Sequence, residues 1–210
     1  AEIASTGKGV SVLVISGGHS SVIALGENNA STSFIASLST SVTAIPFVGE
    51  MCQAMMYSWN NNPPEPCISG APLSLAMKET AVNEYENIDR DNTLILTVKS
   101  PSGGSPVEYS ITMRSPIRVT NANALAGALS AKNNELLNNN VILEDDIMLT
   151  GTGNWTPVGS IGPDPSQVYV DQSFMFTGTF DGGGHTISGL NLTTTNGDAG
   201  FFAAIGKGAY

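Results

Sequence analysis

The fold is decided by two alternating stretches, Thr93-Leu94-Ile95-Leu96-Thr97-Val98 and Val107-Glu108-Tyr109-Ser110-Ile111-Thr112-Met113. In each stretch apolar residues occupy every second position, so their side chains lie on one face of an extended strand. Between the stretches, Ser102-Gly103-Gly104-Ser105 has the composition of a turn. Together they predict a β-hairpin with one buried face.

The sequence before this hairpin has the same character. Val10–Ile15 and Val22–Leu25 are rich in β-branched residues and flank the turn sequence Gly17-Gly18-His19-Ser20, in which we expect His19 to be exposed. Residues 34–47 are typical of strands and end near a proline. Residues 60–66 contain three prolines and predict a loop, because proline cannot donate a ladder hydrogen bond.

Short strands separated by regular turns indicate a β-sandwich over residues 1–116. The segments 92–98 and 108–114, joined by a glycine-containing turn, resemble the end of a cadherin-like β-sandwich repeat of bacterial surface proteins. The resemblance implies an immunoglobulin- or cadherin-like sandwich for this first domain.

The sequence changes character after Pro116. Leu125, Leu129, Lys132 and Leu136 follow one another at helical spacing, which predicts an amphipathic helix over residues 123–138. Asn121 or Asn123 can cap its N-terminus, and Asn138-Asn139-Asn140 favours its end.

Short strands are expected at Val141–Leu143 and Ile147–Leu149, on either side of the acidic residues 144–146. A Trp-x-Pro-x-Gly turn follows at residues 155–159, and then Gly178-Thr179-Phe180-Asp181-Gly182-Gly183-Gly184-His185-Thr186-Ile187-Ser188-Gly189-Leu190. From Ile117 to the end, this order resembles GLUG-type right-handed β-helix segments of bacterial adhesins and IgA-peptidase-type surface proteins. The chain departs from the family at Phe201-Phe202-Ala203, where Leu-Phe-Gly is usual.

This second resemblance implies an all-β chain in which residues 117–210 begin a right-handed parallel β-helix. The predicted helix would cover the open end of the first rung. Ala199–Ile205 is as apolar as an interior rung. We therefore expect this end to stack against further β-helix rungs or against another chain, with the segment being part of a longer protein.

Composition narrows the classes of partner. The formal net charge is -10, from 8 Lys and Arg against 18 Asp and Glu, and no run of three basic residues exists. Nucleic-acid binding is therefore not expected, because phosphate contacts need clustered cations. The longest apolar runs are far shorter than the roughly 20 residues of a membrane-spanning helix.

Two cysteines, Cys52 and Cys67, permit one disulfide that would close a loop of about 15 residues and contribute roughly 3 kcal/mol. Two buried thiols are the alternative. Calcium is a further open question, because residues 89–92 and 164–171 are acidic but lack an ordered calcium-loop pattern.

No catalytic set of residues emerges from the sequence. Asp145, Asp146 and Asp181 could pair as in a glycosidase, but Asp181 stands in a glycine turn where aspartate commonly bonds the local backbone. His185 has no second His or Cys at zinc-ligand spacing, so we expect it at a rung corner, hydrogen-bonded to backbone. Trp59 and Trp155 are expected in the core, although exposed they could stack on a sugar.

These expectations, and chiefly the two resemblances, favour a secreted bacterial cell-surface protein with an adhesive or architectural role, without catalysis or cofactor. Its partner would be a host or environmental glycan or matrix protein. A carbohydrate-binding or carbohydrate-processing accessory module and a passive spacer are the alternatives.

Overall fold

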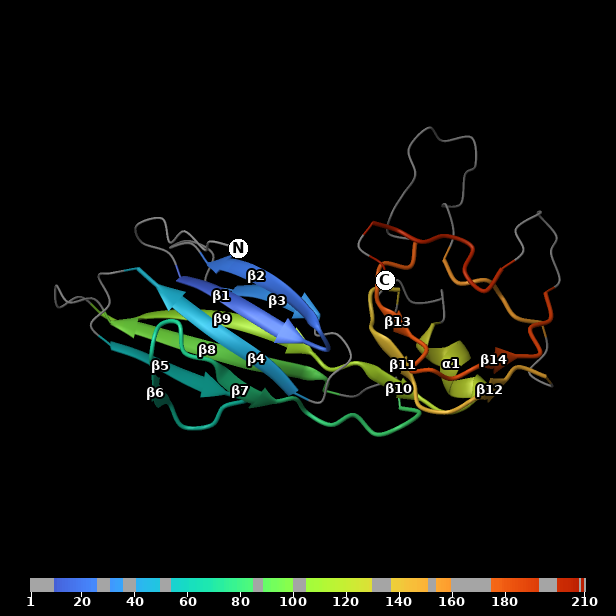
Figure 1. Cartoon of the computed structure of the whole chain (residues 1–210), viewed down its shortest axis with the longest axis horizontal. Coiled ribbons are helices and arrows are strands. Elements are labelled where there is room, and N and C mark those ends of the chain that lie inside the picture. Colours follow the sequence, from blue (N-terminus) through green and yellow to red (C-terminus); the bar gives the residue numbers. More distant parts are fainter. Residues whose placement is uncertain are drawn as a thin grey trace, which may run out of the picture. The chain divides into compact units, whose positions relative to one another are not determined.

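The computed structural model describes residues 10–25, 31–35, 41–49, 54–84, 89–99, 105–129, 137–150, 154–159, 175–192, 200–207 and 209. The chain divides into two compact units (Figure 1), with Ala1–Glu79 and Arg90–Ser115 in unit 1 and Thr80–Asp89 and Pro116–Tyr210 in unit 2. About half of the described residues lie in strands and only one helix occurs among them, so the predicted all-β class is confirmed.

The described residues of unit 1 form two β-sheets. Sheet A is antiparallel throughout and has the strand order β2 (His19–Leu25), β1 (Val10–Ser16), β4 (Ser41–Val48), β7 (Leu73–Ala76). Sheet B has the order β3 (Ser31–Ile35), β9 (Val107–Arg114), β8 (Asp91–Lys99), β5 (Ala54–Trp59), β6 (Glu65–Cys67). In sheet B only the pair β3 and β9 is parallel.

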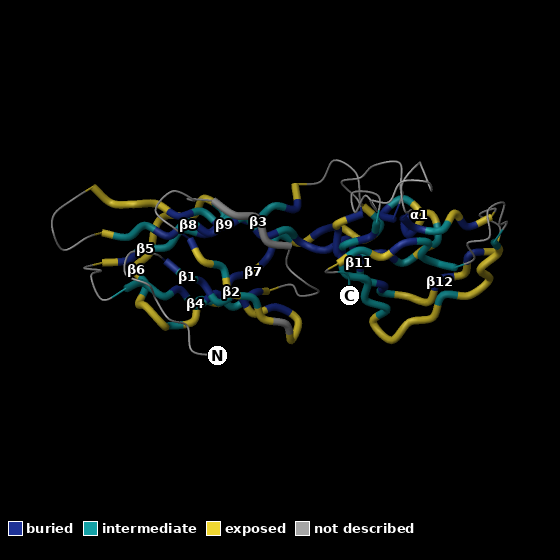
Figure 2. Tube along the Cα trace, turned by 90° about the horizontal axis from the view of Figure 1, so that it is seen from above, coloured by how far each residue is buried: buried dark blue, intermediate teal, exposed yellow. Residues whose placement is uncertain are grey.

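The two sheets share one hydrophobic core, drawn dark blue in Figure 2. Every second residue of the long strands points into it, as the alternating sequence predicts. Sheet A contributes Val10, Val12, Val14, Leu25, Val42, Ala44 and Leu75, and sheet B contributes Trp59, Leu94, Leu96, Tyr109, Ile111 and Met113. Val107 is in phase with this face, as expected, but at the start of β9 its side chain is exposed.

The first hairpin is confirmed, with a tighter turn than predicted. Its turn contains only Gly17 and Gly18, whose φ angles of 54° and 80° suit the type I′ geometry that matches strand twist. Side chains other than glycine rarely adopt two successive positive φ angles. The backbone of His19 therefore pairs with Ser16 inside β2 and does not lie in the turn.

Two prolines occur inside strands, where the sequence predicted a strand end and a loop. Pro46 lies within β4, beyond the last residue of β4 that pairs with β7. Its carbonyl accepts from Gly70, so the ring nitrogen faces a side of the strand where no ladder donor is needed. Pro66 lies in β6, the edge strand of sheet B, where proline is tolerated for the same reason.

One buried asparagine joins several segments of unit 1. The side chain of Asn92 is fully buried, and its Oδ1 accepts from the backbone N–H of Lys78 and from Nδ2 of Asn60. Its Nδ2 lies within hydrogen-bond distance of the carbonyls of Arg90 and Met113 and of the Ser115 hydroxyl. Such a satisfied amide holds the ends of β8 and β9 in a single arrangement.

Unit 2 is built from very short parallel strands. β10 (Ile117–Val119), β11 (Val141–Leu143) and β13 (Phe180–Asp181) form one sheet, and β12 (Ile147–Met148) pairs with β14 (Ile187–Ser188). Parallel bridges also join Val158 to Phe202 and Phe176 to Ile205. The chain therefore passes the same sheet positions repeatedly: β10 belongs to a first pass, β11 and β12 to a second, and β13 and β14 to a third, each parallel to the one before. The passes enclose a core that includes Ile117, Val119, Leu125, Val141, Leu143, Ile147, Trp155 and Phe176.

The helix α1 (Ala122–Ala128) is shorter than the predicted 123–138. Asn121 caps it by accepting the Ala124 N–H, and Leu129 is its C-cap. Residues 130–136 lie outside the described ranges, and Leu137 and Asn138 form a turn. The helix buries Ala124, Leu125 and Ala128 in the core of unit 2, whereas the outer backbone edge of β10 is bound by the segment Thr80–Asn83.

Candidate functional surfaces

The acidic corner between β11 and β12 has structural partners. The carboxylate of Asp145 accepts the N–H of Asp146 at 2.8 Å. The carboxylate of Asp146 accepts the N–H of Thr186 at 2.8 Å, which ties this corner to the next pass of the chain. Both acids face solvent and bond backbone, so neither has the apolar surroundings that create a general acid.

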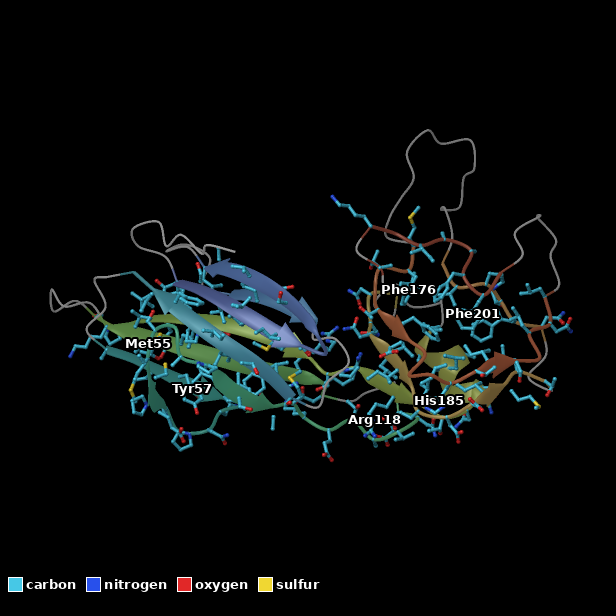
Figure 3. The ribbon with its side chains drawn as sticks, in the orientation of Figure 1. Met55, Tyr57, Arg118, Phe176, His185 and Phe201 are labelled. Carbon is cyan, nitrogen blue, oxygen red and sulfur yellow. The ribbon has the colours of Figure 1, made fainter. Side chains whose placement is uncertain are left out.

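Asp181 and His185 border the glycine turn that follows β13. Asp181 accepts the N–H of Gly183 at 2.8 Å, which confirms the predicted local bond. The imidazole of His185, labelled in Figure 3, lies with its Nδ1 3.6 Å from Oδ1 of Asp146. In the described part of the chain the partner of the imidazole is thus a carboxylate on the neighbouring corner, whereas a bond to backbone was expected from the sequence.

The ion pair of Arg118 and Glu144 is the closest charge pairing among the described residues of unit 2. Nε and Nη2 of Arg118 donate to the two carboxylate oxygens of Glu144 at 2.6 and 2.8 Å. About three-tenths of each side chain is exposed. This bidentate geometry fixes the first pass of the chain to the second and leaves the Glu144 carboxylate committed to a structural role.

The candidate calcium loop at residues 89–92 has other bonds. Asp91 accepts from Nε of Arg114 at 2.7 Å and from Nη2 at 3.3 Å, and Asn92 is the buried amide described above. Residues 164–171 lie outside the described ranges. In the part of the chain that the structure describes, no group of three or more His, Cys, Asp or Glu side chains is placed to hold a metal ion.

The predicted disulfide involves one residue outside the described ranges, Cys52, so it stays a prediction. Cys67 ends β6 and packs, half-buried, against the core of unit 1. As for membranes, none of the described helical residues forms a segment long and apolar enough to cross a bilayer.

Both tryptophans are buried, as predicted. Trp59 is 7% exposed, and its indole donates to the carbonyl of Ala76. Trp155 is 8% exposed, donates to the carbonyl of Phe201 and stacks on that ring at 4.6 Å. Figure 3 labels Phe201 and Phe176 in this cluster, which Phe180 and Phe202 complete. These rings fill the core of unit 2 and do not offer a stacking platform for a sugar.

Two side chains have shifted pKa values: burial shifts that of Arg90, and a hydrogen bond shifts that of Tyr57. Arg90 is 8% exposed, and its desolvation, with the charge of Arg114 nearby, lowers the pKa of its guanidinium. The Tyr57 hydroxyl donates to Glu65 at 3.0 Å, and this bond raises the pKa of the phenol above its usual value. Neither group lies in a described cluster that suggests catalysis.

The most unusual surface is the outer face of sheet A. No Asp, Glu, Lys or Arg occurs in any of its four strands, on a chain with a net charge of -10. The strand register places Val22, Leu13 and Ile45 in one row across β2, β1 and β4, with Val22 52% exposed. Neighbouring rows add the outward residues Ser11, Ile15, Ser20, Ala24, Thr43, Phe47, Ser74 and Ala76.

The outer face of sheet B has the opposite character. Its outward residues include Lys99, Glu108 and the Asp91–Arg114 pair, interspersed with serines and threonines. Sequence reasoning missed this contrast, although the signal was present as uncharged strands in residues 10–25 and 41–48. The uncharged strands define one surface only once β1 is known to pair with both β2 and β4.

Comparisons with protein-family models, with curated proteins and with solved structures found no match for the chain.

Proposed function

We propose that the chain is a non-catalytic part of an extracellular cell-surface protein and that the uncharged outer face of sheet A is its adhesive surface. In this proposal unit 1 is an immunoglobulin- or cadherin-like sandwich and unit 2 is the start of a GLUG-type right-handed β-helix. The partner is a glycan or a matrix protein. The observation that carries the adhesive role is the absence of charge from the four strands of sheet A.

Desolvation supports this choice of surface. Burying a charge in an interface without a partner is costly, and the centres of protein interfaces are depleted of charged residues. The row of Val22, Leu13 and Ile45 offers apolar area, and the flanking serines and threonines offer hydroxyl groups for hydrogen bonds. A contiguous apolar patch on a polar protein is a common mark of an interaction site.

The parallel strands of unit 2 support an architectural role. Each pass of the chain stacks on the previous one in register, as at Ile117, Val141 and Phe180. Stacked passes make an elongated, quasi-one-dimensional support in repeat proteins. Such a support suits a protein that holds a binding domain away from a cell.

The acids of unit 2 favour a structural interpretation over a carbohydrate-processing one. Asp146 and Asp181 each accept a backbone N–H at a turn, and Glu144 is bonded at both oxygens by Arg118. The accessory-module alternative would need an acidic pair facing a groove beside exposed aromatic rings, and both tryptophans are buried.

The test is binding of the full chain to an array of glycans and matrix proteins, with and without calcium. We expect saturable binding to one class of ligand, weakened about tenfold or more by Val22→Lys, which places a charge in the centre of the apolar row. Val107→Lys is the matched control, because Val107 is 47% exposed on a strand of sheet B.

Two results would contradict the proposal. Absence of binding to the whole array would favour a passive spacer. Equal weakening by the two lysine substitutions would show that the outer face of sheet A is not the binding surface.

A further inference from the structure

The outer edge of β10 presents backbone groups away from the rest of its sheet. On the inner side, Ile117 N–H donates to Asn140 and the Val119 carbonyl accepts from Glu144, each at under 3 Å. Backbone groups of successive residues in a strand point to opposite sides. The carbonyl of Arg118 and the N–H of Thr120 therefore face outward, as the edge of a parallel sheet that could accept a further strand.

A single asparagine binds both of these groups. The backbone N–H of Asn83 donates to the Arg118 carbonyl at 2.8 Å. The N–H of Thr120 donates to the side-chain Oδ1 of Asn83, also at 2.8 Å. In a parallel bridge opposite Val119, the second acceptor would be the main-chain carbonyl of the partner residue. Here the amide oxygen of the side chain takes its place.

This substitution of side chain for main chain ends the ladder. Asn83 has a φ of 65°, in the left-handed region, so its own backbone does not continue as a strand. Its Nδ2 lies 2.8 Å from the Thr120 hydroxyl, which fixes the amide with its oxygen toward the Thr120 N–H. The edge is satisfied without offering a new edge beyond it.

Thr80 fixes the start of the same segment. It is 3% exposed, and its hydroxyl donates to the carbonyl of Pro116 at 2.9 Å. Nη1 of Arg118 reaches the carbonyl of Thr80 at 3.4 Å while the rest of the guanidinium holds Glu144. The segment is thus anchored at both ends, on β10 and, through Arg118, on the pass that follows.

We infer that Thr80–Asn83 is a strand-blocking cap that closes the β10 edge of unit 2 to any added strand, including one from a second copy of the chain. Unprotected edges are the usual route of such addition, and proteins cover them with loops or helices. In sequence the cap lies between β7 and β8 of unit 1. The edge strand β10 of unit 2 is therefore covered by a segment that connects two strands of unit 1. The inference concerns how one sheet edge is closed and is independent of the proposed adhesive role.

The first test is amide hydrogen exchange by NMR in the full chain. Asn83→Gly keeps the left-handed conformation and the N–H donor but removes the Oδ1 acceptor. We expect the Thr120 amide to exchange about tenfold faster, with the Leu96 amide in unit 1 unchanged. Asn61→Gly is the matched control, because Asn61 has a φ of 63° in an exposed turn of unit 1.

The second test removes the cap. Asn83→Pro eliminates the N–H donor and the side-chain acceptor and cannot adopt the observed φ. We expect this variant to self-associate with rising concentration in sedimentation velocity, with unit 1 amide resonances retained, while Asn61→Pro stays like the unmodified chain.

Two results would overturn the inference. Unchanged Thr120 exchange in Asn83→Gly would show that the side-chain bond does not protect this edge. A folded Asn83→Pro variant that associates no more than the unmodified chain would show that the segment does not block strand addition.

Discussion

The two units use different means to satisfy a β backbone. In unit 1, β8 has nine residues and β9 has eight, and their antiparallel ladder pairs backbone with backbone along nearly the whole length. In unit 2, β11 has three residues and β13 has two. Side-chain oxygens bond the backbone between these short strands, as when Asn140 accepts from Thr179 and Asp146 accepts from Thr186.

This difference teaches where each unit is vulnerable. Long strands place many apolar side chains in one core, so unit 1 depends most on packing. Short strands separated by tight corners depend on particular residues at the corners, because an added side chain there would clash with the backbone of a neighbouring pass. Substitutions should therefore destabilise the two units for different reasons: loss of core packing in unit 1 and steric clash at the corners in unit 2.

The largest effect is expected from a cavity in unit 1. Ile111 is fully buried in β9, between β3 and β8. Ile111→Ala should lower the free energy of unfolding of unit 1 by about 2 to 5 kcal/mol, measured by urea denaturation followed at Trp59 in a Trp155→Phe background. Ile95→Ala, on the outward side of β8, should cost less than half as much; equal losses would contradict the assigned faces.

The next largest effect is expected at a corner of unit 2. A Cβ on Gly178 would clash with the carbonyl oxygen of Asn139, which is backbone and cannot rotate away. Gly178→Ala should destabilise unit 2 by about 1 to 3 kcal/mol, measured by exchange of the Val141 amide. Gly184 has open space around its Cβ position, so Gly184→Ala tests the cost of its φ of 85° without a clash. A larger loss at Gly184 would refute the steric explanation.

The smallest effect is a change in pH dependence. The hydrogen bond to Glu65 raises the pKa of Tyr57 above 10.0, so the folded state holds the phenol proton more tightly than the unfolded state. This contribution to stability is present below pH 10 and is lost as pH rises through the folded-state pKa. Tyr57→Phe should reduce the alkaline loss of stability in urea titrations. An unchanged or steeper loss would argue against the bond.

Periodicity predicted the parts of the fold that local sequence determines. The strand pair of residues 93–98 and 107–113, the first hairpin and the strands on either side of residues 144–146 are present. Pro46 and Pro66 were misjudged because tolerance of proline depends on whether its nitrogen faces a paired neighbouring strand. Which side of a strand is paired is a property of the sheet and cannot be read from neighbouring residues.

The functional surfaces were less predictable than the strands. The cap at Thr80–Asn83 has no apolar periodicity, and its role appears only when it lies beside β10. The uncharged face of sheet A likewise requires three strands to be brought into register. Local bonds such as that of Asp181 to Gly183 were predictable because both groups lie in one turn.

The central claim is that unit 2 stacks in parallel register, and a cross-link tests it most directly. Met148 and Ser188 are exposed register partners in β12 and β14. With Cys52 and Cys67 replaced by serine, Met148→Cys and Ser188→Cys should together form a disulfide within one chain on mild oxidation, detected by mass spectrometry. Met148→Cys with Leu190→Cys should not. Cross-linking of the second pair and not the first would contradict the parallel register.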